Sequence, residues 1–272
     1  MKPSVTQRTD WPAAIQHTFR FFNLKDYANE KIEPRIVFYL QMLENFDLLC
    51  PSTKLADLGA GIYWFDPLVQ ALGVDIHLVD DFGGGGGVDN LNRSPSATIL
   101  KRYSEELNIP MHQQDILTGP LPFESGSMDA VTCFHCLEHW HHSPKKLFGE
   151  IRRILKPGGL LFLATPNAVN IRKRITVLLG MNNWSPLDEW FDEEPYFRGH
   201  VREPILKDLR SICVRNNFKV EAQYGRNFIG GDSQVLARFR RLPVHALANI
   251  SQLFLQFVPT LCSDLHVVAR KL

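Results

Sequence analysis

The feature that most constrains the fold is a regular alternation of short apolar segments with segments of helical periodicity between residues 54 and 167. The apolar segments are 54–59, 75–80, 111–116, 128–135 and 160–166. The helical segments are 63–73, 96–107 and 143–159, the last expected to end at Pro157-Gly158-Gly159. Strands that alternate with helices form a parallel sheet, and strands covered on both faces are apolar along their length. The sequence therefore predicts a doubly wound α/β fold.

The flanking segments extend this prediction to the whole chain of 272 residues. Residues 1–50 have apolar side chains at helical spacing and predict an N-terminal helical cap. After Asn167 the alternation stops, and residues 168–203, rich in Trp, Asn, Pro and Arg, predict a lid or substrate insertion. The remaining segments are a helix over 204–217, a strand over 218–225, a helix over 244–258 and a last strand over 265–272. We expect one domain.

A run of five glycines, Gly83–Gly87, follows the second predicted strand in the segment FGGGGGVDN. A phosphate-binding loop needs a Lys and a Ser or Thr after its glycines, and neither follows with the required spacing. We expect a flexible connector at the rim of the binding site.

Composition and charge exclude several classes of protein. A formal net charge of +1 gives no reason to expect a nucleic-acid partner. Residues 1–150 carry 12 basic and 19 acidic residues and residues 151–272 carry 18 and 10, so the basic second half fits an anionic acceptor. The N-terminus lacks the apolar core of a secretory signal, and no apolar stretch reaches the roughly 18 residues of a membrane span. Five scattered cysteines argue against a disulfide framework and for a reducing compartment, so we expect a cytoplasmic protein.

Ligands of open parallel sheets bind beyond the carboxyl ends of the strands, so residues that follow the strands are the candidate binding residues. The segment DLGAG follows the first strand, and Gly59 and Gly61 let the backbone approach a ligand closely. The pattern is neither a dinucleotide nor a phosphate-loop motif, and the Asp57 carboxylate favours a cationic ligand. Asp80 ends the second strand, where a carboxylate accepts from both ribose hydroxyls. Asp115, after the third strand, is placed to accept from an adenine amino group.

Together these segments resemble the class I S-adenosylmethionine-dependent methyltransferases, in the branch that acts on small molecules. The resemblance rests on LADLGAG, LVDD, QQDI, MDAVTCFHCLEHW and LFGEIRRILKPGGLLFLATPN, which span roughly residues 50–170. It implies a seven-stranded, mostly parallel sheet with an antiparallel last strand, and S-adenosylmethionine as the cofactor. The cofactor-binding residues expected at these motifs are Asp57, Gly59, Ala60, Gly61, Asp80, Asp81, Asp115, Ile116 and His135. Tyr63 stands where the family often has a third glycine, which narrows the expected pocket.

The histidines after the fourth strand are the candidate catalytic residues. Methyl transfer is an in-line displacement, in which the enzyme aligns the acceptor and, for a hydroxyl, removes its proton. Histidine has a pKa suited to that proton. His139 matches the histidine of the LEH motif in the ubiquinone-type and sugar-type branches of the family, and His135 is the second candidate. The alternative is that Glu138 and His139 cap the next helix or bond the loop backbone.

Cys133 and Cys136 have the spacing of a zinc knuckle. The sequence holds no second cysteine pair, and Cys133 falls inside a predicted buried strand. We therefore expect no metal.

The predicted lid and the segment after it supply the candidate acceptor-binding residues. The segment YFRGHVREP resembles the HvRE segment of methyltransferases from bacterial polysaccharide and lipid-sugar gene clusters, which places His200 and Arg202 beside the acceptor. Arg172 is a candidate partner for a phosphate on the acceptor, and Trp184 is a candidate stacking platform. Alternatively, the polar and basic residues cap a helix and face solvent, and the aromatic residues fill a small core within the lid itself. The helix over 244–258 is expected to cover the sheet, with contact to a membrane surface or a dimer partner as the alternative.

These residues predict an enzyme that methylates an oxygen of a sugar or of a glycolipid or polysaccharide precursor. A quinone-type or other small-molecule O-methyltransferase is the enzymatic alternative. A non-catalytic binding or scaffold protein is the alternative of another class, and the intact acidic residues Asp57, Asp80 and Asp115 disfavour it. The expected partners are a small-molecule acceptor, anionic or lipid-linked, and a second copy of the chain.

Overall fold

The computed structural model describes residues 11–22, 34–83, 97–192, 197–227 and 257–272. The chain divides into two compact units, residues 1–113 and residues 114–272. The single domain expected from the sequence stays a prediction. Most of the glycine run and most of the helix expected over 244–258 lie outside the described residues.

Seven strands form a sheet in the order β3-β2-β1-β4-β5-β7-β6. They are β1 (Lys54–Leu58), β2 (Asp75–Asp80), β3 (Met111–Gln113), β4 (Met128–Phe134), β5 (Leu155–Pro166), β6 (Phe218–Arg226) and β7 (Asp264–Lys271). The pairs β1–β2, β2–β3 and β4–β5 are parallel, whereas β7 runs antiparallel to β5 and β6. This confirms the predicted seven-stranded, mostly parallel α/β fold with an antiparallel last strand.

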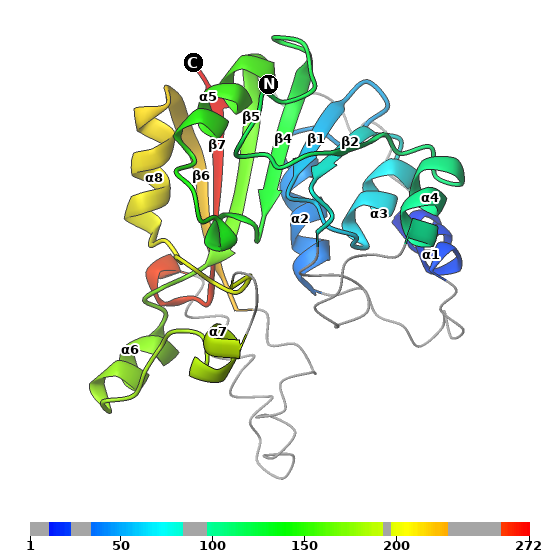
Figure 1. Cartoon of the computed structure of the whole chain (residues 1–272). Coiled ribbons are helices and arrows are strands. Elements are labelled where there is room, and N and C mark those ends of the chain that lie inside the picture. The colour runs from blue at the N-terminus through cyan, green and yellow to red at the C-terminus, as the bar shows by residue number, and fades with distance from the viewer. Residues whose placement is uncertain (1–10, 23–33, 84–96, 193–196, 228–256) are drawn as a thin grey trace. The chain divides into compact units, whose positions relative to one another are not determined.

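The first unit combines β1, β2 and β3 with four helices (Figure 1). These helices are α1 (Trp11–Phe21), α2 (Pro34–Glu44), α3 (Phe65–Ala71) and α4 (Ala97–Glu105). Phe19 of α1 packs edge-to-face on Trp64, with ring centroids 5.4 Å apart, and Tyr39 of α2 packs on Phe65 at 6.0 Å. The helices of the predicted N-terminal cap therefore hold the turn that leads from β1 into α3.

The second unit combines β4 to β7 with α5 (Lys145–Ile154), α6 (Ile171–Leu178), α7 (Leu187–Asp192), α8 (Leu206–Arg215) and the short 3-10 helices η1 (Leu137–His139) and η2 (Pro259–Leu261). In Figure 1, α8 lies alongside β6, and it buries Leu209 and Cys213. Helices α6 and α7 follow the carboxyl end of β5 and lie in the segment 168–203, whose role as a lid stays a prediction. No side chain of either helix is buried, so these two helices do not build a core of their own.

Among the residues described, no helix combines the length and the apolar character that a membrane crossing requires.

Strand β5 begins earlier than expected. Helix α5 ends at Ile154 and β5 begins at Leu155, so Pro157-Gly158-Gly159 lies inside the strand and does not close the helix. The register of β4 against β5 shifts between Met128 and Ala130, opposite these residues. Gly158 has a φ of +75°, which glycine adopts without strain, and the segment forms an irregularity in the strand.

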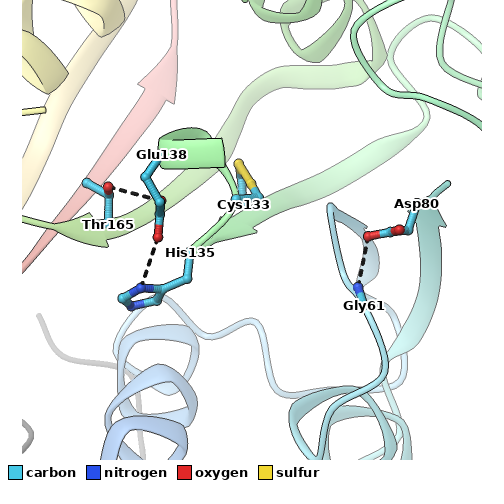
Figure 2. Close-up of a disulfide and its surroundings, with 7 residues drawn as sticks. Gly61, Asp80, Cys133, His135, Glu138 and Thr165 are labelled. Carbon is cyan, nitrogen blue, oxygen red and sulfur yellow. Dashed lines mark hydrogen bonds and ion pairs between the residues drawn. A yellow bond between two sulfur atoms is a disulfide. The ribbon is translucent and has the colours of Figure 1, made fainter. Parts of the chain in front are cut away.

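A disulfide joins Cys133 in β4 to Cys136, with their Cα atoms 6.2 Å apart (Figure 2). The expectation of no disulfide framework is corrected to this extent, and the two sulfurs do not form a zinc knuckle. His135, between the two cysteines, has a φ of +52°, which turns the chain back on itself within three residues. No disulfide is formed by Cys50, Cys213 or Cys262.

Candidate functional site

The loop after β1 has the conformation that its glycines were expected to permit. Gly59 has a φ of +65° and Gly61 a φ of +60°, in the left-handed region where a Cβ is strained. The N–H of Gly59 donates to the carbonyl of Val79 in β2 at 2.9 Å. Both glycines and Ala60 between them are half-buried, so the backbone of this loop is accessible to a ligand.

The carboxylate at the end of β2 holds this loop. The N–H of Gly61 donates to Oδ2 of Asp80 at 3.0 Å, and the N–H of Phe82 donates to Oδ1 at 2.5 Å (Figure 2 shows the first bond). Burial raises the pKa of Asp80, against the effect of these two backbone donors. Each carboxylate oxygen accepts more than one hydrogen bond, so Asp80 retains capacity for the hydroxyls of a ligand.

A second buried carboxyl group, Asp66 in α3, lies beside Asp57. Asp57 is 5% exposed and Asp66 is fully buried. Burial, and then the negative charge of Asp57, raise the pKa of Asp66 well above its ordinary value. Asp66 therefore favours its neutral form, which leaves the negative charge of the pair on Asp57.

The other acidic residues of the predicted cofactor site have local partners. Oδ1 of Asp81 accepts from the N–H of Gly83 at 2.7 Å, and Asp81 is exposed. In the second unit, Oδ1 of Asp115 accepts from the N–H of Leu117 at 2.8 Å, which leaves Oδ2 for a ligand. Asp115 is exposed and Ile116 is 6% exposed, so the pair presents one polar and one apolar side chain.

His135 lies between two acidic side chains of the second unit. Its Nδ1 is 3.3 Å from Oε1 of Glu138 and its Nε2 is 3.5 Å from Oδ1 of Asp264. Glu138 also accepts a hydrogen bond on Oε2 from the hydroxyl of Thr165 at 3.1 Å (Figure 2). Burial acts to raise the pKa of Glu138, but the contact with His135 and the charges of His135 and His139 keep that pKa below its ordinary value.

His139 bonds the loop backbone through one of its nitrogens. Nδ1 lies 2.7 Å from the carbonyl oxygen of Arg198 and 3.2 Å from that of Gly199. A carbonyl only accepts, so Nδ1 carries a proton and the neutral ring has its lone pair on Nε2. His139 therefore bonds the loop backbone, as the alternative interpretation of the sequence expected, but it does so through Nδ1 alone. Its Nε2 stays available for chemistry.

The predicted acceptor residue His200 packs edge-to-face against His139, with ring centroids 4.9 Å apart. Its Nδ1 lies 2.8 Å from Oε1 of Glu203, and this contact raises the pKa of His200. The other oxygen of Glu203 forms an ion pair with Lys173 of α6. Lys173, next in sequence to the predicted phosphate partner Arg172, is thus paired with a carboxylate.

A cavity of about 430 Å³ opens beside His200. Its lining includes the predicted acceptor residue Trp184 and the aromatic side chains of Trp190 and Phe197. Trp184 is 73% exposed, so its ring is available for stacking. The other two predicted acceptor residues, Arg172 and Arg202, are exposed and do not line this cavity.

The sequence analysis did not single out three residues of the site, Asp66, Thr165 and Asp264. Thr165 lies inside the motif LFGEIRRILKPGGLLFLATPN and Asp264 directly precedes the predicted last strand, but the role of each depends on contacts across the fold. A carboxyl group inside an otherwise apolar helix segment, as at Asp66, is the one signal that sequence reading offers.

Comparison with known proteins finds methyltransferases similar to parts of this chain. Residues 85–163 match the family described as "Methyltransferase domain". The protein of Arabidopsis thaliana named "Probable methyltransferase PMT28" is 35% identical over 120 residues, which is 43% of this chain and 17% of that protein. The ubiquinone biosynthesis O-methyltransferase of Xanthomonas oryzae pv. oryzae is 50% identical over 44 residues, 16% of this chain and 18% of that protein. The chain spans less than a quarter of the length of the first curated relatives that it matches.

Solved structures share the fold over most of the chain. An S-adenosylmethionine-dependent methyltransferase from Archaeoglobus fulgidus has a TM-score of 0.51 at 12% identity, over 92% of this chain and 99% of that chain. One from Mesorhizobium loti has a TM-score of 0.51 at 17% identity, over 84% of this chain and 96% of that chain. At these identities the likeness concerns the fold.

Proposed function

Since the chain has the fold and the domain signature of the class I S-adenosylmethionine-dependent methyltransferases, we propose that it transfers a methyl group from S-adenosylmethionine, the cofactor of that family, to an oxygen of a small-molecule acceptor. The observation that carries the proposal is the bond between Gly61 and Asp80. It joins a left-handed glycine loop to an acidic strand end, the combination that a nucleoside with a ribose diol requires.

The residues of the first unit fit a cationic nucleoside. Asp57 holds a negative charge beside the neutral Asp66, which suits a positively charged methionine portion better than a phosphate. Asp80 supplies acceptors for the ribose hydroxyls, and we assign Asp81 to the same rim. In the second unit we assign Asp115 and Ile116 to the adenine, one through its free carboxylate oxygen and one through apolar contact.

The histidines of the second unit supply the proton acceptor. S-adenosylmethionine, when bound, supplies a methyl group on a positively charged sulfur. An acceptor oxygen would take this methyl group as its bond to sulfur breaks, and a histidine nitrogen of this chain would receive the hydroxyl proton. Nε2 of His139 has the required lone pair. His135 is the second candidate, and it lies between the carboxyl groups of Glu138 and Asp264.

We assign the acceptor to the cavity beside His200. Aromatic rings such as that of Trp184 stack on the apolar faces of sugars, and the exposed guanidinium groups of Arg172 and Arg202 suit a phosphate. A sugar that is linked to a nucleotide or lipid carries both features, and this supports O-methylation in polysaccharide or glycolipid synthesis. A cytoplasmic location, membrane-surface contact and a homodimer belong to the same proposal.

A quinone-type acceptor is the second candidate function. The 50% identity to a ubiquinone biosynthesis O-methyltransferase over 44 residues favours it, and an aromatic cavity also accepts a phenol ring. A scaffold protein without activity is the remaining candidate. Titration with the cofactor decides whether it is excluded.

Calorimetric titration with S-adenosylmethionine and with S-adenosylhomocysteine tests the cofactor site. We expect both to bind in the micromolar range, on the order of −8 kcal/mol. Asp80→Asn is expected to weaken both by about tenfold or more, because it removes the charged acceptor of the ribose hydroxyls. Asp75→Asn, at the opposite end of the same strand, is the matched control and should bind as the wild type does. If folded wild-type protein binds neither compound, the scaffold alternative replaces the proposed function.

Mass spectrometry of acceptors distinguishes the two candidate functions. The protein is incubated with S-adenosylmethionine and, in separate reactions, with a nucleotide-linked sugar, a lipid-linked sugar or a polyprenylated phenol. Methylation of a sugar supports the first candidate, and methylation of the phenol alone establishes the second.

A further inference from the structure

The side chains of Glu138, His139 and His200 each place one potential metal-ligand atom within 4.8 Å of the others. We propose that these three residues bind a divalent transition-metal ion, with Zn²⁺ the best match. All three lie in the second unit, where His200 is distant in sequence from the other two. The proposal departs from the expectation of no metal that the spacing of Cys133 and Cys136 had supported.

Both histidines are oriented as metal ligands are. A metal-binding histidine usually donates its other ring N–H to a carbonyl or a carboxylate, which fixes the tautomer and leaves the second nitrogen for the ion. Nδ1 of His139 donates to the carbonyl of Arg198 at 2.7 Å, and Nδ1 of His200 faces Oε1 of Glu203 at 2.8 Å. In both neutral rings the lone pair is then on Nε2.

Glu138 supplies the charged ligand. It is fully buried, and its Oε1 makes no hydrogen bond among the described residues. Nδ1 of His135 lies 3.3 Å from that oxygen, without a hydrogen bond between the two atoms. Its other oxygen accepts from the hydroxyl of Thr165 at 3.1 Å, which holds the carboxylate in place. A buried carboxylate oxygen without a hydrogen bond is costly unless a cation compensates it.

Backbone hydrogen bonds in both directions hold the ligands of this site together. The carbonyl of Glu138 accepts from the N–H of Val201 at 2.7 Å and from that of Arg202 at 3.1 Å. In the opposite direction, the Nδ1–H of His139 donates to the carbonyl of Arg198. The loop that carries His200 is thereby tied to η1, and the three ligands are positioned before an ion arrives.

The charges around the site are compatible with a cation. The positive charge of Lys173 acts on His200, and the ion pair of Lys173 with Glu203 offsets that charge. Ligand atoms at 2.0–2.2 Å from a tetrahedral Zn²⁺ are about 3.4 Å apart. The ligand atoms, which lie within 4.8 Å of one another, therefore need to approach by up to about 1.4 Å, which side-chain torsions allow.

Two imidazoles and one carboxylate select among metals. This set is used by catalytic zinc sites and by iron(II) sites with two histidines and one carboxylate. Mg²⁺ and Ca²⁺ prefer oxygen ligands, so the set disfavours them. Three protein ligands leave at least one coordination position for water or for another oxygen ligand.

The role of the ion in catalysis rests on the proposed function. His200 lines the cavity assigned to the acceptor, so an acceptor hydroxyl can take the open position of the ion. A metal-bound hydroxyl loses its proton more readily. With His139 occupied by the metal, His135 is the histidine left to receive that proton.

Metal binding is tested on the full chain without substrate. The protein is freed of metal with a chelator and titrated calorimetrically with Zn²⁺, and Co²⁺ is added as an absorbance probe of the ligand geometry. We expect one ion of either metal per chain, and Mg²⁺ to bind at least about 100-fold more weakly than Zn²⁺. Glu138→Gln and His200→Ala are expected to weaken Zn²⁺ binding by about 100-fold, because each removes a ligand. His142→Ala, an exposed histidine three residues from His139, is the control and should leave binding unchanged.

Two results would overturn the proposal: no stoichiometric Zn²⁺ binding by the wild type, or binding that persists in both ligand variants. Glu138→Gln retains an acceptor for Thr165, and His200 is half-exposed, so the native fold of each variant can be verified by circular dichroism. A separate chelation experiment measures methyl transfer and S-adenosylmethionine binding with and without Zn²⁺. Loss of transfer with retained cofactor binding supports the catalytic role, and unchanged transfer overturns that role alone. Failure of cofactor binding with intact Zn²⁺ binding overturns the proposed function and leaves the metal site standing.

Discussion

The backbone N–H of Gly61 donates to the carboxylate of Asp80 at 3.0 Å, so the loop after β1 and the end of β2 form one hydrogen-bonded structure. The loop keeps this geometry because Gly59 and Gly61 both occupy the left-handed region. A ligand that binds the carboxylate therefore also meets the half-buried, accessible backbone of the loop.

Gly61→Ala is expected to weaken S-adenosylmethionine binding by about tenfold, which corresponds to roughly 1.4 kcal/mol. An alanine in the left-handed region costs about 1–2 kcal/mol, and relief of that strain moves the N–H away from Asp80. Calorimetry measures the affinity. Gly149→Ala in α5 is the control, because a Cβ there meets no atom within 4 Å and alanine favours a helix. Equal affinity of both variants would show that the loop conformation does not matter for binding.

Asp66→Asn is expected to become more stable relative to the wild type as the pH rises. Burial and the charge of Asp57 raise the pKa of Asp66, so the folded protein holds this proton more tightly than the unfolded chain. The stabilising contribution of this group is complete below the unfolded pKa of about 3.9 and is lost as pH rises through the folded pKa. Each unit of pKa difference is worth about 1.4 kcal/mol above both values. Asparagine does not titrate and escapes this loss.

Thermal unfolding between pH 5 and pH 9, about the range in which most proteins are stable, measures the effect of Asp66→Asn. The difference in Tm from wild type should grow with pH until Asp66 is fully ionised. Asp188→Asn, an exposed residue of α7, should follow the wild-type curve. A Tm difference for Asp66→Asn that stays constant with pH would contradict the raised pKa.

The sequence was sufficient for the sheet and for the cofactor loop because both have local causes. Strands covered on two faces are mostly apolar, and β1 is buried after its first residue, with Asp57 as its acidic residue. Glycine is the residue for a left-handed turn, as at Gly59 and Gly61. Asp80 was predicted as a cofactor-binding residue because it is the last residue of a predicted strand. The start of β5 was missed because Pro157-Gly158-Gly159 is a usual helix end, and the strand pairing with β4 overrode it.

The candidate metal ligands and the disulfide could not be predicted, because they depend on contacts that leave no local pattern. His139 bonds the carbonyls of Arg198 and Gly199, and any residue type at those positions supplies the same carbonyls. Cys133 and Cys136 meet because His135 adopts a positive φ, which is uncommon for a residue other than glycine.

Asn167→Ala is expected to destabilise the protein by about 2 kcal/mol. The Asn167 amide is fully buried, donates to the carbonyls of Thr260 at 3.0 Å and Cys262 at 2.8 Å, and accepts from the N–H of Val169 at 3.1 Å. Alanine leaves these groups without their partner, which costs more than the lost bonds alone. Chemical unfolding of the variant measures the change. Asn182→Ala, an exposed residue that also accepts a backbone bond, should lower the free energy of unfolding much less.

The ion pair of Lys173 and Glu203 is expected to contribute a coupling energy of about 1–3 kcal/mol to stability. Their side chains are 11% and 14% exposed, and Glu203 also contacts His200, so removal of either partner leaves a charge that water solvates poorly. A double-mutant cycle of Lys173→Met and Glu203→Gln, measured by chemical unfolding of the metal-free protein, gives the coupling directly. The pair Lys101 and Glu105, 69% and 64% exposed, is the control and should couple by no more than about 0.5 kcal/mol. If both cycles give the same small value, α6 is not held to the loop around His200 by this pair.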